Sequence, residues 1–193
     1  DIVVLSQGGD FDKSTAKSRQ DECKKIWEGI DNINGVFIES EFIKDKDEDG
    51  WINVLENKFD ISSYDCIFTP SPLDSHFEHR MVSDFTYALV RRSKCGIIQY
   101  KSPSTLDTWI PNFFVDIGVI ENRDEEDGHS NQTHTLFMAG IWYIKFNRMK
   151  MFESQQDKSY FEDQSLKSFH SNYQCSMREM PRVESFKIIR GYN

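Results

Sequence analysis

Short apolar runs that end near glycine or proline alternate along this chain with longer segments of helical spacing. Two of these runs, residues 66–69 and 96–100, contain β-branched and aromatic residues and are separated by a helix-like stretch over 78–92. A strand, a helix and a second strand in this order need a crossover connection, which is typical of parallel strands with helices on their faces. The pattern therefore predicts an α/β fold, in detail a Rossmann-like three-layer sandwich with a mostly parallel sheet.

Further segments of the same two kinds extend the prediction from residue 2 to residue 132. The expected strands also cover residues 2–5, 36–43 and 112–117, the expected helices 14–30 and 51–59, and an acidic exposed insertion 121–132. A chain of 193 residues fits one domain with a sizeable core. We therefore interpret residues 1–193 as a single domain.

Charge and composition argue against several classes of partner. The net charge of −9 would repel a phosphate backbone, so we expect no nucleic acid partner. No stretch approaches the roughly 18 consecutive apolar residues that span a bilayer, so we expect no membrane span and take the cytoplasm as the compartment. The four cysteines are far apart and form no Cys-x-x-Cys pair, which argues against a thiolate zinc knuckle. An oligomer remains open.

The residues with the most chemical potential lie directly after the strand-like run 66–69. Two histidines and two carboxylates fall within six residues there: Asp74, His76, Glu78 and His79. Histidine is the commonest metal ligand and a carboxylate usually orients it, and active sites of parallel sheets lie at the carboxyl ends of strands. The segment therefore predicts a metal or catalytic site, the alternative being two surface histidines on a charged helix start.

The segment from Cys66 to Arg80 resembles the second motif of the LmbE/PIG-L-like N-acetylglucosamine deacetylases. That motif is an apolar strand followed by Asp-x-His-Pro-Asp-His-Arg, and this chain has Phe77 for the proline and Glu78 for the second aspartate. Three other stretches resemble family features in the same order. They are Leu5–Gly8 with Arg19-x-x-Glu22, Pro111–Ile117 with Lys145 and Ser154-Gln155, and Val183–Phe186.

This resemblance implies a zinc-dependent hydrolase that removes the N-acetyl group from an amino-sugar conjugate. His79 matches the histidine that binds zinc, and His76 matches the histidine that stabilises the oxyanion or protonates the leaving amine. Glu78 matches the acid that orients this second histidine. Arg19 matches an arginine of the substrate pocket, and Asp74 matches the acid that opens the motif, which we group with Arg19 at the substrate.

The first motif of the family, Ala-His-Pro-Asp-Asp-Glu, occurs nowhere in this sequence. In the family it supplies the other zinc ligands and the carboxylate base, and it lies on the first strand. We therefore expect this chain to lack the first strand and first motif, which would precede Asp1. The alternative is a homologue that binds carbohydrate without catalysis.

A second motif competes with this interpretation. Residues Asp45 to Glu56 fit the pattern of an EF-hand calcium loop, with Gly50 in the sixth place and Glu56 in the twelfth. The preceding residues 36–43 resemble a strand more than the entering helix of an EF-hand, and no second loop accompanies this one. A calcium-binding protein therefore remains an alternative, with an acidic solvated loop as the simpler interpretation.

Overall fold

The computed structural model describes residues 1–6, 13–38, 46–117, 144–171 and 183–190. Contacts divide the chain into two units, which are described separately. The helical unit comprises Asp1–Ile2, Asp12–Val36 and Val115–Glu184, and the sheet unit comprises Val3–Phe11, Phe37–Phe114 and Ser185–Asn193. The expected insertion 121–132 lies outside the described residues.

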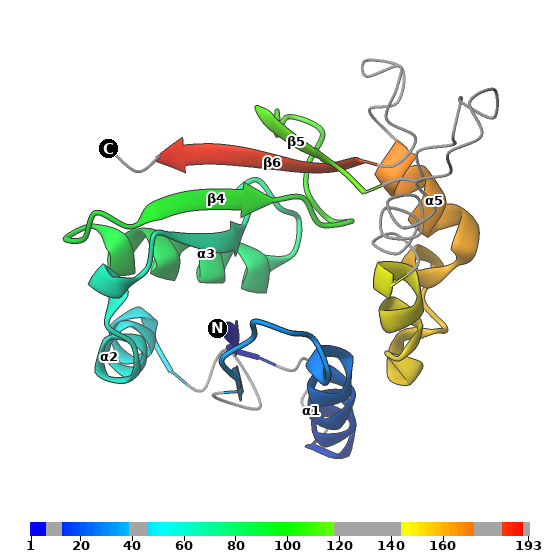
Figure 1. The fold of residues 1–193 in the computed structure, drawn as a ribbon, viewed down its shortest axis with the longest axis horizontal. Helices are drawn as coiled ribbons and strands as arrows, with labels where there is room; N and C mark the ends of the chain where they lie inside the picture. The colour runs from blue at the N-terminus through cyan, green and yellow to red at the C-terminus, as the bar shows by residue number, and fades with distance from the viewer. Residues whose placement is uncertain (7–12, 39–45, 118–143, 172–182, 191–193) are drawn as a thin grey trace, which may run out of the picture. The chain divides into compact units, whose positions relative to one another are not determined.

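The larger sheet has four strands in the order β3-β4-β6-β5 (Figure 1). Their bounds are β3 Cys66–Pro70, β4 Gly96–Tyr100, β5 Phe113–Asp116 and β6 Val183–Arg190. Strands β3 and β4 run parallel, with Cys66 opposite Gly96 and Pro70 opposite Tyr100. Helix α3 (Phe77–Val90) connects them, as the predicted crossover requires. A separate two-stranded sheet pairs β1 (Ile2–Val4) with β2 (Val36–Ile38).

The prediction of an α/β fold is confirmed, but the Rossmann-like, mostly parallel sheet is wrong for the described strands. Strand β6 runs antiparallel to β4, with Tyr100 opposite Phe186, so the sheet is mixed and only partly parallel. Residues Val183–Phe186 were expected as a motif, and the strand that contains them was not predicted. Nothing local reveals the direction of such a strand, because an antiparallel neighbour needs no crossover helix.

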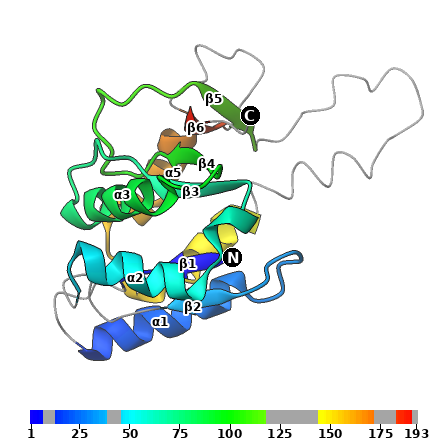
Figure 2. The same ribbon diagram turned by 90° about the vertical axis from the view of Figure 1, so that its left-hand side faces the viewer.

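Helix α3 covers one face of the β3–β4 pair, and helix α2 (Glu48–Lys58) packs against α3 (Figure 2). The core between these elements includes Trp51, which is 0% exposed, together with Leu55, Phe85 and Leu89. The rings of Trp51 and Phe85 are tilted, with their centroids 6.5 Å apart. Burial of such large apolar side chains fixes α2 on the sheet unit.

Helix α2 also decides against the calcium alternative. The Asp47 carboxylate accepts a hydrogen bond from the backbone nitrogen of Gly50 at 2.8 Å and caps the helix, which then continues to Lys58. Most of the proposed loop is therefore helical, and Trp51 in its seventh place is buried. A helix cannot wrap these oxygen atoms around one ion, so the EF-hand interpretation is wrong.

The helical unit contains α1 (Lys13–Trp27), a helical stretch over 144–150, and α5 (Asp163–Ser171). Three short 3-10 turns complete the described elements: η2 (Ile61–Ser63) in the sheet unit, and η3 (Glu153–Gln155) and η4 (Ser159–Phe161) in the helical unit. Within the ranges given above, no helix is both long and apolar enough to cross a membrane.

Candidate functional site

The candidate site lies where the parallel strands β3 and β4 end. The loops that follow these strands meet, because the carboxyl ends of parallel neighbours share one edge of the sheet. Asp74 forms an isolated antiparallel bridge with Thr105, and the backbone nitrogen of Leu106 donates to the carbonyl of Leu73 at 2.9 Å. The loop after β3 is the predicted site, and in the structure the loop after β4 joins it.

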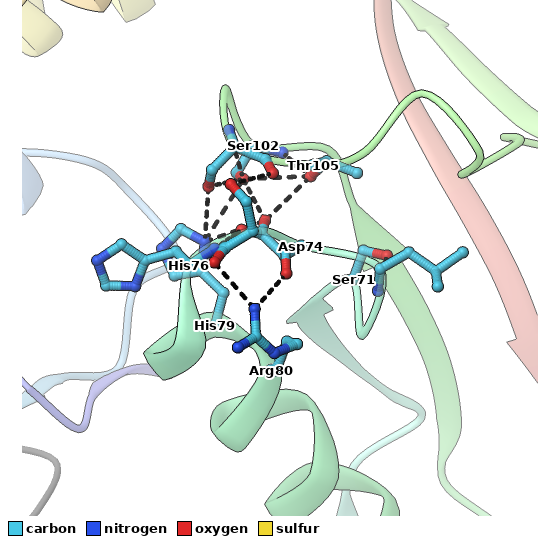
Figure 3. A network of polar contacts seen from close by, with 10 residues as sticks. Ser71, Asp74, His76, His79, Arg80, Ser102 and Thr105 are labelled. Atoms are coloured by element: carbon cyan, nitrogen blue, oxygen red, sulfur yellow. Dashed lines mark hydrogen bonds and ion pairs between the residues drawn. The ribbon is translucent and has the colours of Figure 1, made fainter.

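Asp74 is the centre of the polar network in Figure 3, and only 2% of it is exposed. Its Oδ1 accepts a hydrogen bond from the backbone nitrogen of His76 at 2.8 Å. Its Oδ2 accepts from the hydroxyls of Ser102 at 2.6 Å and Thr105 at 3.2 Å, and it lies 3.1 Å from Nδ1 of His79. A side chain that is so enclosed cannot contact a substrate, so the expected substrate-binding role of Asp74 becomes a supporting one.

The surroundings of Asp74 keep its carboxylate charged. Burial by itself raises the pKa of this carboxyl, but hydrogen bonds from Ser102, Ser104, the backbone nitrogen of His76 and His79 outweigh burial and lower the pKa from 3.8 to about 2. Hydrogen bonds favour the charged form of a carboxyl because they stabilise its negative oxygens. Asp74 is therefore a buried anion at neutral pH.

The two histidines of the motif lie together at the start of α3, as their spacing predicts. Their ring centroids are 4.7 Å apart. His76 is exposed and stacks on Phe77, with ring centroids 5.8 Å apart and an interplanar angle of 11°. His79 leaves 37% of its side chain exposed while its Nδ1 faces the buried Asp74. This part of the chain therefore has an exposed histidine, His76, and a partly exposed one, His79, whose ring nitrogen contacts a buried carboxylate.

Glu78 has a different neighbour from the one that the resemblance implies. The hydroxyl of Ser6 donates to Oε1 of Glu78 at 3.5 Å, which is a long hydrogen bond. Among the described residues, the His76 ring has no hydrogen bond, and its contacts are the rings of Phe77 and His79. Orientation of His76 by Glu78 therefore remains a prediction.

Two hydrogen-bonded arrangements in this part of the sheet unit were not predicted from the sequence. Nη1 of Arg80 donates to the carbonyls of Asp74 at 2.6 Å and Ser75 at 2.9 Å, which ties the loop to α3. The indole nitrogen of the buried Trp109 donates to Oε1 of Gln99 at 2.9 Å. A glutamine inside an apolar strand was the available signal, because a buried amide needs partners.

Arg19, the expected substrate-pocket residue, lies on α1 in the helical unit and is therefore described apart from His76 and His79. The amide of Gln155 is oriented so that its oxygen and its nitrogen both have hydrogen-bond partners. In this orientation its oxygen accepts from Nε and Nη2 of Arg19 at 2.6 Å each. One turn along α1, the Glu22 carboxylate accepts from the backbone nitrogen of Ser154 at 2.9 Å and from its hydroxyl at 2.7 Å. Two of the stretches quoted for the resemblance thus contact each other across more than 130 residues of sequence.

Zinc was expected here on the basis of the resemblance. Within the described ranges, no group of three or more histidine, cysteine, aspartate or glutamate side chains is arranged to hold a metal ion. His79 with Asp74 behind it is nevertheless the usual arrangement of a metal-binding histidine and its carboxylate partner. These residues fit one ligand position, and the other ligands of a zinc site would come from outside the described residues.

Comparison with known proteins adds a likeness of fold. The sequence matches no protein-family model and no curated protein. Among solved structures, the chain is similar to GalB, the 4-carboxy-2-hydroxymuconate hydratase from Pseudomonas putida KT2440, with a TM-score of 0.60. The match covers 97% of this chain and 82% of that chain at 12% sequence identity. The fold of this chain is therefore one that an enzyme also has, and at this identity the likeness does not extend to residues or reaction.

Proposed function

We propose that this chain is part of a zinc-dependent N-deacetylase that acts on an N-acetylated amino-sugar conjugate, a small-molecule substrate. The single observation that carries the proposal is His79 at the start of α3, with 37% of its side chain exposed and its Nδ1 3.1 Å from a buried, charged Asp74. This pair occupies the motif that resembles the deacetylase family, at the carboxyl end of a parallel strand. The contacts of Arg19 with Gln155 and of Glu22 with Ser154 support it further.

The proposed reaction is the hydrolysis of an amide. The oxygen of water forms a bond to the carbonyl carbon, the C–N bond breaks, and the products are acetate and the free amine. A zinc ion held by His79 and by ligands outside the described residues would acidify the attacking water and polarise the carbonyl. His76, exposed beside His79, would donate a hydrogen bond to the oxyanion or a proton to the amine nitrogen.

The test is zinc content and acetate release from the full-length protein that carries this chain. We expect about one bound zinc and release of acetate from N-acetylglucosamine conjugates. His79→Ala should lose both, and His76→Gln should lose activity but keep zinc. Asp84→Ala, at an exposed position of α3, is the control within the same helix and should change neither.

A carbohydrate-binding protein without catalysis is the second candidate. It is favoured by one observation, that the described residues hold no group of three metal ligands. Binding of amino sugars without bound zinc, without acetate release and without any effect of His79→Ala would favour this second function and overturn the first.

A further inference from the structure

Two of the hydroxyl groups around Asp74, those of Ser102 and Thr105, can be assigned their hydrogens. Ser102 Oγ donates to Asp74 Oδ2 at 2.6 Å. Thr105 Oγ1 accepts from the backbone nitrogen of Ser102 at 2.8 Å and donates its own hydrogen to the same Oδ2. Ser104 Oγ lies 3.0 Å from Ser102 Oγ and 3.3 Å from Nδ1 of His79, and its one hydrogen can serve only one of its neighbours.

The atom nearest to Nδ1 of His79 is an oxygen that can only accept a hydrogen bond. The nearest atoms are Asp74 Oδ2 at 3.1 Å and Ser104 Oγ at 3.3 Å. An ionised carboxylate has lone pairs and no hydrogen to give. A lone pair on Nδ1 would therefore face a buried negative oxygen, whereas a hydrogen on Nδ1 makes a charge-assisted hydrogen bond with it.

We infer that Asp74, fixed by Ser102 and Thr105, is a positioning residue that holds neutral His79 with its ring hydrogen on Nδ1 and its lone pair on Nε2. Nε2 has no hydrogen-bond partner among the residues that the structure describes, and 37% of the side chain is exposed. One ring nitrogen is thus prepared to bind a Lewis acid before that acid arrives. The purpose assigned to this lone pair rests on the proposed function, whereas the position of the hydrogen does not.

The loop after β4 is part of this arrangement although it lies far away in sequence. Ser102 is 28 residues from Asp74, and Thr105 is 31 residues from it. Their two hydroxyls, with the backbone nitrogen of His76 on Oδ1, determine how the carboxylate is turned. Oδ1 accepts from the backbone nitrogen of His76, and Oδ2 is therefore the oxygen that faces the ring of His79.

The isosteric change Asp74→Asn predicts the opposite tautomer. The backbone nitrogen of His76, which donates at 2.8 Å, cannot turn away, whereas the hydroxyls of Ser102 and Thr105 can rotate. The side-chain oxygen should therefore stay on the His76 side, and the amide NH2 should face Nδ1 of His79. An NH2 group donates, which requires the lone pair on Nδ1 and moves the ring hydrogen to Nε2. In a serine protease triad, the same substitution of the supporting aspartate keeps the geometry but leaves the wrong tautomer.

The decisive measurement is the tautomer itself, read from nitrogen-15 NMR of labelled histidine at about pH 8, where an unperturbed imidazole is neutral. The protein is kept in a chelator, and the His79 signals are assigned by their loss in His79→Gln. We expect Nδ1 to carry the hydrogen in the wild type and Nε2 to carry it in Asp74→Asn. Ser75→Ala is the matched control, because its hydroxyl donates to the Ser104 carbonyl at 3.0 Å and bonds to neither Asp74 nor His79.

A wild-type spectrum with the hydrogen mainly on Nε2 would overturn the inference. This test needs only the wild-type protein, so it still decides the question if Asp74→Asn fails to fold. A second arm titrates zinc into the full-length protein, where Asp74→Asn should weaken binding about 10- to 100-fold and Ser75→Ala should not. If the tautomers are as expected but no variant holds zinc, the proposed function fails and the positioning role of Asp74 stands.

Discussion

Replacing Gln99 by leucine should destabilise the protein by about 2–4 kcal/mol. Gln99 is 2% exposed on β4, where it accepts from the indole nitrogen of Trp109 and donates to the hydroxyl of Tyr87, each at 2.9 Å. Losing the bond to the half-buried Tyr87 costs about 1 kcal/mol, because that hydroxyl can turn to water. Leaving the indole donor of Trp109, 3% exposed, without an acceptor costs about 1–3 kcal/mol more.

A double-mutant cycle separates the hydrogen bond from the loss of packing. Trp109→Phe removes the donor and leaves the oxygen of Gln99 unpaired, so it should also destabilise by about 2–4 kcal/mol. In the double variant neither polar group remains, and its cost should fall short of the sum by about 1–3 kcal/mol. Urea denaturation gives all four free energies of unfolding. Additive costs, with a coupling below about 0.5 kcal/mol, would refute the reasoning.

Three further predictions concern single positions. A Cβ at Gly96 would lie 2.9 Å from the carbonyl oxygen of Arg190, so Gly96→Ala should cost about 1–3 kcal/mol in urea denaturation, and an unchanged midpoint would contradict it. The pKa of Asp74 is about 2 in the folded protein and 3.8 without its partners. The charged carboxylate should therefore contribute about 2 kcal/mol to the free energy of unfolding above about pH 4, and this contribution should be lost as the pH falls towards 2. Thermal denaturation across this range should show a weaker pH dependence for Asp74→Asn, and equal slopes would count against the prediction. The hydroxyl of Ser83 is buried with no partner among the described residues, so Ser83→Ala should raise stability by about 1 kcal/mol, whereas a loss of stability would reveal a partner.

Much of the local structure could be predicted because it depends on neighbours in sequence. The expected strand 96–100 is β4, the expected helix 78–92 corresponds to α3, and the expected strand 66–69 differs from β3 by one residue. The same local logic placed the candidate site at the end of β3, with His76 and His79 side by side at a helix start. The supports of that site could not be predicted in this way, because Ser102 and Thr105 reach Asp74 across 28 and 31 residues of sequence.

The calcium alternative shows how two local patterns can conflict. Residues Asp45 to Glu56 satisfy the residue types of a calcium loop, but they also contain a helix cap at Asp47 and an apolar Trp51. Burial of that tryptophan against Phe85 favours the helix. The spacing of acidic residues carries no information about this tertiary contact.

By itself the sequence determined several helices and strands, among them β3, α3 and β4, and which residue types gather after β3, since short-range spacing and turn residues set both. Tertiary structure alone decided the antiparallel direction of β6 and the burial of Asp74, because each depends on a partner that sequence distance does not reveal. It also decided what the site contains. Two loops that end neighbouring parallel strands are brought together by the sheet, and only there does an aspartate meet the hydroxyls that keep it charged behind His79.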